Sequence, residues 1–169
     1  MDLLPYIPPE GIEEIVKRIA AEISSDYRGR SPVVVGVLKG AFLFISDLVR
    51  SLAVDHEVDF IQTACYGMRD VPSEEVLILR DVTTDLKGRD VIIVEDIIDR
   101  GHTARALKKY FSDKGAASVK VCALLKRDGG SPEAADYLGA VIGRGFVVGY
   151  GMDYKERYRG LPGLYLIEG

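Results

Sequence analysis

Residues 91–103 read VIIVEDIIDRGHT, and this stretch decides the fold. The four apolar β-branched residues at 91–94 are typical of a strand that is buried on both faces of a sheet. Three carboxylates follow within five positions, and Gly101 then lies in a short loop that opens a helix expected over 103–114. A strand, a loop and a helix in this order are the start of a βα unit in a parallel sheet.

The flanking sequence repeats this alternation of strands and helices. Apolar runs predict strands over 33–37, 58–61, 76–79 and 119–125, and apolar residues at helical spacing predict helices over 10–27 and 42–52. The alternation predicts an α/β fold, a mostly parallel twisted sheet with helices on both faces. Short apolar runs at 141–142, 146–148 and 164–167 do not continue it. We expect the N- and C-terminal segments to form a small hood over the sheet edge.

Length, composition and charge exclude several classes of function. The 169 residues are 47% hydrophobic and 28% charged, as in ordinary globular proteins, and no linker divides residues 1–169, so one domain is expected. The net charge of -4 and the pI of about 5.3 argue against a general affinity for nucleic acid. No apolar run is long enough to span a membrane.

The few cysteines and histidines limit the compartment and the metal chemistry. Cys65 and Cys122 lie far apart in sequence, which favours a reducing compartment over a disulfide framework. The N-terminus lacks the pattern of a signal peptide, so we expect a cytoplasmic protein. Two histidines are too few for a typical histidine metal site, and any metal would lie on carboxylates and substrate oxygens, which favours Mg²⁺.

The acidic stretch and the loop after it suit a phosphorylated sugar. Ligands of open α/β sheets bind outside the carboxyl ends of the strands. The loop at 99–103 presents backbone N–H groups at a helix N-terminus, which suits a phosphate. Glu95 and Asp96 suit ribose hydroxyls, magnesium or a proton on a base. A lone acid here would more often cap the next helix, but three acids in five positions favour a site.

Residues 91–103 also resemble the phosphoribosyl pyrophosphate motif of type I phosphoribosyltransferases. The form Glu-Asp-Ile-Ile-Asp is similar to that of hypoxanthine-guanine phosphoribosyltransferases. The resemblance implies a purine-salvage enzyme that transfers a phosphoribosyl group from phosphoribosyl pyrophosphate to a 6-oxopurine and releases pyrophosphate. It implies that Glu95 and Asp96 hold the ribose and magnesium and that Asp99 is the general base at purine N7. The implied binding loop for the 5′-phosphate consists of Asp99, Arg100, Gly101, His102 and Thr103.

Two further segments match the same family. Leu38-Lys39-Gly40-Ala41 resembles its pyrophosphate loop, in which a non-proline cis peptide exposes backbone N–H groups. Residues 124–127 resemble the strand whose lysine, here Lys126, donates to the purine O6, which selects oxo over amino purines. From spacing alone, a solvated side chain is the favoured interpretation for both lysines, in an ordinary turn for Lys39 and at the end of a strand for Lys126.

The C-terminal stretch 146–159 resembles the family's second signature. The resemblance implies that Phe146 stacks on the purine and that the Val147 backbone meets its edge. Asp153 would lie near the magnesium and the base, and Arg159 would meet pyrophosphate. Packing in the core is the alternative role for Phe146.

Two positions depart from the family pattern. Arg100 stands where the family has a small hydroxyl residue, and its side chain has no assigned role. Cys65-Tyr66 takes the place of Ser-Tyr in the family's lid, expected here over 63–75, and Tyr66 is the candidate lid residue over the leaving group.

Three alternatives stay open from the sequence. One is a preference for xanthine, and another is a pyrimidine as the base. The third is a nucleotide-sensing regulator on the same fold. The resemblance further implies a homodimer or homotetramer whose partners are phosphoribosyl pyrophosphate and a 6-oxopurine, with no nucleic acid and no membrane.

Overall fold

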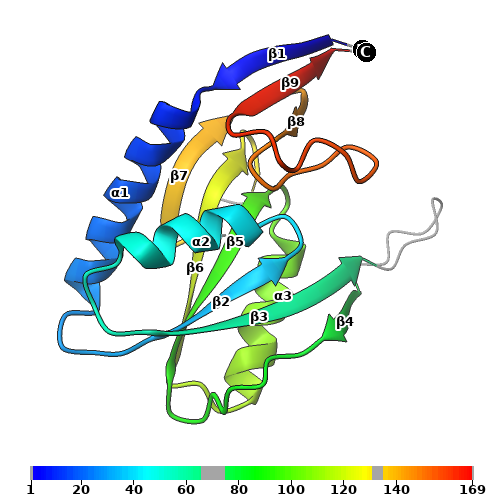
Figure 1. Cartoon of the computed structure of the whole chain (residues 1–169). Helices are drawn as coiled ribbons and strands as arrows, with labels where there is room; N and C mark the ends of the chain where they lie inside the picture. Colours follow the sequence, from blue (N-terminus) through cyan, green and yellow to red (C-terminus); the bar gives the residue numbers. More distant parts are fainter. Residues whose placement is uncertain (1, 66–74, 131–134, 169) are drawn as a thin grey trace.

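The computed structural model describes residues 2–65, 75–130 and 135–168, and its centre is a six-stranded sheet (Figure 1). The strand order is β4-β3-β2-β5-β6-β7, and all neighbours pair in parallel except β3 and β4. The strands are β2 (Val33–Leu38), β3 (Glu57–Cys65), β4 (Val76–Arg80), β5 (Asp90–Ile98), β6 (Ser118–Arg127) and β7 (Tyr137–Ile142). The predicted α/β fold with a mostly parallel sheet is confirmed.

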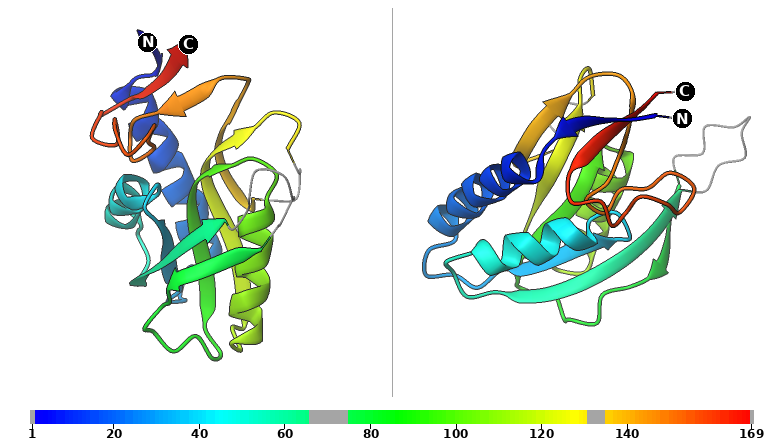
Figure 2. Two further views of the ribbon diagram at one scale, coloured as in Figure 1. Left: turned by 90° about the vertical axis from the view of Figure 1, so that its right-hand side faces the viewer. Right: turned by 45° about the horizontal axis from the view of Figure 1, so that its top comes forward.

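Helices cover both faces of this sheet. The helices α1 (Pro9–Asp26) and α2 (Phe42–Ser51) lie on one face, and α3 (His102–Asp113) lies on the other (Figure 2). The continuous apolar run of β5 serves both layers, because Ile92 and Val94 pack with α1 and α2 while Val91 and Ile93 pack with α3. This double burial explains why β5 lacks the alternating pattern of a strand with one wet face. No helix in the described ranges is long and apolar enough to cross a membrane.

The chain ends form the expected hood. The strands β1 (Asp2–Ile7), β9 (Leu164–Glu168) and β8 (Phe146–Val148) pair as a separate antiparallel sheet, with both termini side by side at the top of Figure 1. The segment between β8 and β9 is fastened to α2 by a hydrogen bond that the Tyr150 hydroxyl donates to Asp47. The hood therefore lies over the end of the sheet where β2 and β5 finish.

Three elements differ from the sequence-based expectation. The strand β5 continues to Ile98, so Glu95 and Asp96 lie within the strand and not in the loop after it. The strand β3 reaches Cys65, because antiparallel pairing with β4 supports its polar end. The strand β7 joins the main sheet as a parallel neighbour of β6, because Asp136 exchanges hydrogen bonds with the Val121 backbone at the start of this pair. No helix precedes β7 among the described residues of this connection, 128–130 and 135–136.

Candidate active site

The loop after β2 packs directly on the carboxylate of Asp96 in β5. A Cβ atom built on Gly40 would lie 2.0 Å from Asp96 Oδ2, so only glycine fits there without moving the carboxylate. The Leu38–Lys39 peptide is cis, as the resemblance implied. A Cβ atom on Gly151, in the segment after β8, would lie 2.3 Å from the Gly40 carbonyl oxygen. Three chain segments thus meet at the carboxyl end of the sheet, and only the Asp96 carboxylate lies between the β5 backbone and Gly40.

Glu95 is buried and Asp96 is partly buried, in an environment that disfavours the charge of both acids. Glu95 is 6% exposed, and its Oε1 has no hydrogen-bond partner among the described residues. Burial, aided by the neighbouring Asp96 charge, raises the pKa of Glu95 to about 8. Burial also raises the pKa of Asp96, although backbone N–H groups and the Arg159 charge oppose the shift. A pair of this kind favours a proton or a cation.

The oxygens of these acids suit a hard divalent cation, because such ions prefer carboxylate ligands. The orphaned Glu95 Oε1 is free to take such a role. Asp96 and Asp153 line one cavity, so the acids predicted to bind metal come from neighbouring segments. Within the described ranges, however, no group of three or more His, Cys, Asp or Glu side chains could hold an ion unaided. A cation bound here would complete its coordination with oxygens from water or from a bound molecule.

Two cavities of about 250 Å³ each lie at this edge of the sheet and share Ile97 and Asp99. The first is lined by Glu95 and residues 97–104, and it therefore contains the whole predicted phosphate loop. The second is lined by Asp96, Arg127, Phe146, Val147, Met152 and Asp153 together with the shared pair. Asp99 thus lies between the predicted sugar-phosphate side and the predicted base side.

The phosphate loop leads directly into α3. Gly101 adopts a left-handed conformation with φ 78° immediately before His102 begins the helix. The N-terminus of a helix favours an anion, because its first N–H groups point out along the axis. Arg100 is exposed and lines the same cavity as His102 and Thr103. The local geometry therefore suits a phosphate group, as the sequence predicted.

The predicted pyrophosphate cations lie together. Lys39 Nζ is 3.1 Å from Glu156 Oε2, and Arg159 Nη2 is 3.2 Å from Glu156 Oε1. Arg159 also pairs with Asp153 Oδ1 at 3.2 Å, and its Nη1 donates to the Gly151 carbonyl at 2.7 Å. The structure therefore brings together the predicted residues Lys39, Asp153 and Arg159. It adds Glu156, whose role no spacing in the sequence indicated.

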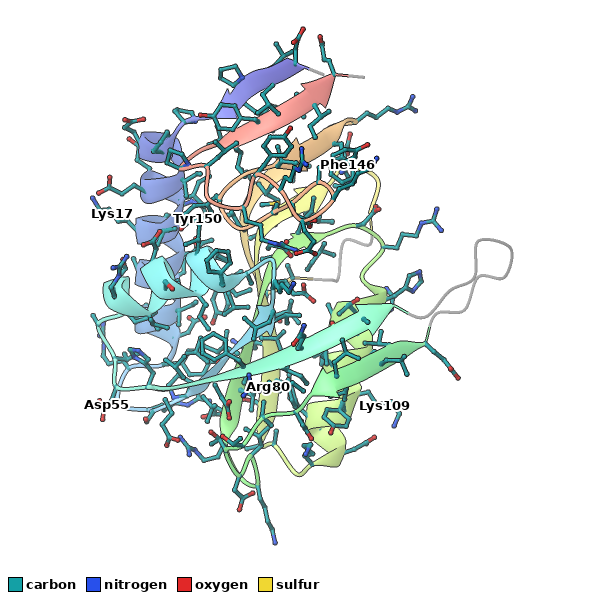
Figure 3. All side chains as sticks on the ribbon, turned by 45° about the vertical axis from the view of Figure 1, so that its right-hand side comes forward. Lys17, Asp55, Arg80, Lys109, Phe146 and Tyr150 are labelled. Carbon is teal, nitrogen blue, oxygen red and sulfur yellow. The ribbon has the colours of Figure 1, made fainter. Side chains whose placement is uncertain are left out.

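The base side of the site presents an accessible aromatic ring. Phe146 is 48% exposed and makes an edge contact with Tyr154, with ring centroids 5.4 Å apart, so the core role considered for it is wrong (Figure 3). Val147 lies beside it in the cavity wall but is buried. Lys126 is partly buried at the end of β6 and does not line the cavity that Phe146 and Val147 line.

Arg127 is the lining residue that the sequence did not single out. Its Nη1 donates to the carbonyls of Gly143 and Gly145 at 3.2 and 2.8 Å, which fixes the turn before Phe146. The predicted lid residue Tyr66 lies outside the described residues. Its role stays a prediction. The roles assigned to the other site residues also stay predictions, because they concern contacts with a substrate.

The buried acid Glu95 makes folding stability depend on pH. Between the ordinary value of 4.5 and the raised pKa of about 8, the folded chain keeps a proton that the unfolded chain has released. The stabilisation from this proton is fully present below pH 4.5, decreases as the pH rises, and is lost once the pH passes the folded-state pKa of about 8. Relative to wild type, Glu95→Gln should therefore gain unfolding free energy from about pH 5 to about pH 8, by a few kcal/mol (~1.4 kcal/mol for each pKa unit).

Urea unfolding across this pH range, without added divalent ions, measures the difference. Glu14→Gln, an exposed change of the same type on α1, should show no such trend. If the difference in unfolding free energy between Glu95→Gln and wild type did not change with pH, the raised pKa of Glu95 would be contradicted.

Comparisons with known proteins agree with this geometry. The family model described as "Phosphoribosyl transferase domain" matches residues 9–155. The hypoxanthine-guanine phosphoribosyltransferase of Bacillus subtilis is 42% identical over 158 residues, which are 92% of this chain and 88% of that protein. The enzyme of the same name from Streptococcus pneumoniae strain R6 is 44% identical, covering 89% of this chain and 85% of that protein. The chain also matches the bifunctional protein TilS/HprT of Listeria innocua at 44% identity, but spans only 24% of its length.

Solved structures match over nearly the whole chain. A hypoxanthine-guanine phosphoribosyltransferase from Bacillus anthracis has a TM-score of 0.90 at 38% identity, covering 97% of this chain and 98% of that one. A hypoxanthine phosphoribosyltransferase from Staphylococcus aureus has a TM-score of 0.92 at 32% identity, covering 97% and 90%. On the combined evidence of motif, site and similarity, this chain belongs to the hypoxanthine-guanine phosphoribosyltransferase family.

Proposed function

We propose that this protein makes purine nucleoside 5′-monophosphates from phosphoribosyl pyrophosphate and hypoxanthine, with guanine as a second substrate. The observation that carries the proposal is the pair of cavities that share Asp99, one containing the phosphate loop and the other an accessible Phe146. A sugar phosphate in the first and a purine in the second would bring ribose C1 and purine N9 to the same place. Holding both reactants in this way is a large part of catalysis by proximity.

The sugar is held from two sides in this proposal. The loop at 99–103 binds the 5′-phosphate at the start of α3, and Glu95 and Asp96 accept hydrogen bonds from the ribose hydroxyls. Bond breaking at C1 leaves positive charge on the ribose ring and negative charge on pyrophosphate. The buried carboxylates favour the first, and Lys39 with Arg159 stabilises the second.

Magnesium is the proposed cation, held by Glu95, Asp96 and Asp153 together with substrate oxygens. It would neutralise part of the pyrophosphate charge. This assignment is supported by the orphaned oxygen of Glu95 and by the cavity that Asp96 and Asp153 line together.

The purine is held by stacking and by its edge. Phe146 provides an exposed ring face, the Val147 backbone lies next to it, and Lys126 donates to the purine O6. Asp99 accepts the N7 proton as N9 forms the bond to C1 and the C1–oxygen bond to pyrophosphate breaks. We also propose that the protein acts in the cytoplasm as a homodimer or homotetramer, in line with the family resemblance.

The proposal predicts a clear order among bases. Pyrophosphate release should occur with hypoxanthine and guanine and be at least about 100-fold slower with adenine, because the adenine amino group would face the Lys126 donor. The measurement is the rate with magnesium, phosphoribosyl pyrophosphate and each of hypoxanthine, guanine, xanthine, adenine and uracil. Turnover with xanthine alone would instead support a xanthine enzyme. Binding of phosphoribosyl pyrophosphate without turnover of any base would support the regulatory alternative.

The base role of Asp99 predicts a separation of binding from turnover. Asp99→Asn keeps the shape of the side chain but cannot accept the N7 proton as a carboxylate does, so kcat should fall by about 100-fold or more. The dissociation constant for phosphoribosyl pyrophosphate should change by less than about threefold. Asp55→Asn, far from Phe146 in Figure 3, serves as the control and should leave both values unchanged. An equal loss of binding and turnover in Asp99→Asn would count against a base.

A further inference from the structure

Glu156 joins the two cations that are assigned to pyrophosphate. Its carboxylate oxygens lie 3.1 Å from Lys39 Nζ and 3.2 Å from Arg159 Nη2. Lys39 lies in the loop after β2, whereas Glu156 and Arg159 lie between β8 and β9, so this carboxylate links two distant parts of the chain. The Glu156 side chain is 66% exposed, and packing therefore does not explain its position.

The backbone at Glu156 has a conformation that disfavours residues with a side chain. Tyr154 and Arg157 exchange backbone hydrogen bonds of 3.1 and 3.0 Å, which closes a two-residue hairpin. The central residues Lys155 and Glu156 have φ values of 50° and 62°. Positive φ at both positions is the signature of a type I′ turn, which prefers Asn-Gly. A turn without glycine here calls for compensating interactions.

The compensating interactions connect the turn to Asp153 and to the two pyrophosphate cations, with one further contact inside the turn. The Glu156 N–H donates to Asp153 Oδ2 at 2.8 Å, and its side chain meets Lys39 and Arg159. The Lys155 ammonium lies 5.3 Å from the centre of the Tyr154 ring. The turn therefore delivers a fixed negative charge to a pair of cations.

Pyrophosphate needs the same donors. An oxygen of pyrophosphate that binds Lys39 Nζ or Arg159 Nη2 must share that nitrogen with Glu156 or replace it. Arg159 is otherwise anchored by Asp153 and by the Gly151 carbonyl, so its guanidinium stays in place when Glu156 leaves. Among the described residues Lys39 forms no second ion pair, so its ammonium is available to the diphosphate once Glu156 is displaced.

We propose that Glu156 is a positioning residue that sets the affinity for pyrophosphate by competing with it. The carboxylate keeps Lys39 and Arg159 aligned across the site, and its displacement weakens the binding of pyrophosphate and of the diphosphate arm of the substrate. The same competition speeds release of the product. This inference rests on the proposed function, which supplies the diphosphate.

The test removes the charge and keeps the shape. Glu156→Gln should bind inorganic pyrophosphate, with magnesium, about two- to tenfold more tightly than wild type in calorimetry, since exposed ion pairs of this kind have modest strength. The KM for phosphoribosyl pyrophosphate should fall by a similar factor, whereas the KM for hypoxanthine should not change. The gain should shrink at about 0.5 M salt, because screening weakens the competing ion pairs. Glu14→Gln controls for the change in net charge and should match wild type.

Two results would overturn the inference. Unchanged pyrophosphate affinity in a folded Glu156→Gln would show that the ion pairs do not compete, and weaker binding would show that the carboxylate only supports the site. If glutamine prevents folding, Glu156→Asn serves, because asparagine tolerates a left-handed backbone. The binding measurement needs no base, so a wild type that binds pyrophosphate but turns over no purine would refute the proposed function and leave this test intact.

Discussion

The site depends on one close approach, the contact of the Gly40 backbone with the partly buried carboxylate of Asp96. The parallel pairing of β2 with β5, in which Gly36 lies opposite Val94, brings the ends of both strands to one edge. The Gly40 carbonyl in turn meets Gly151, so the segment that contains Arg159 is placed by the same contact. Because these contacts leave no room for a further side chain, small backbone shifts in any of the three segments move the acids and the cations together.

This packing also creates the chemistry. Apolar layers on both faces of β5 bury Glu95 and partly bury Asp96, and this burial disfavours the charged forms of both acids. Arg159, whose charge offsets part of that of Asp96, comes from a segment that is far away in sequence but adjacent in space. Negative charge in the strand and positive charge around it suit a substrate that carries a ribose and a diphosphate. The proposed competition by Glu156 is a consequence of placing such cations beside acids.

Local sequence predicts most of the sheet and the phosphate loop. Burial on both faces requires a continuous apolar run, so 91–94 identified the centre of β5 without its tertiary context. The end of β3 and the place of β7 in the sheet were missed. Pairing with β4 fixes the first and pairing with β6 fixes the second, and the sequence of a strand does not specify its partner. Family resemblance supplied Lys39 and Arg159. The contact between Lys39 and Glu156 spans 117 residues, and no local spacing reports it.

The measurement that tests this account most directly is pyrophosphate binding by Gly40→Ala, with turnover measured beside it. Gly40 has no positive φ, so alanine acts there only through its Cβ atom, which meets Asp96. Gly143→Ala is the matched control, since a Cβ atom at that position meets nothing within 4 Å. The account predicts a folded Gly40→Ala protein whose affinity and turnover fall at least about tenfold, with the control unchanged. Wild-type affinity and turnover in Gly40→Ala would contradict it.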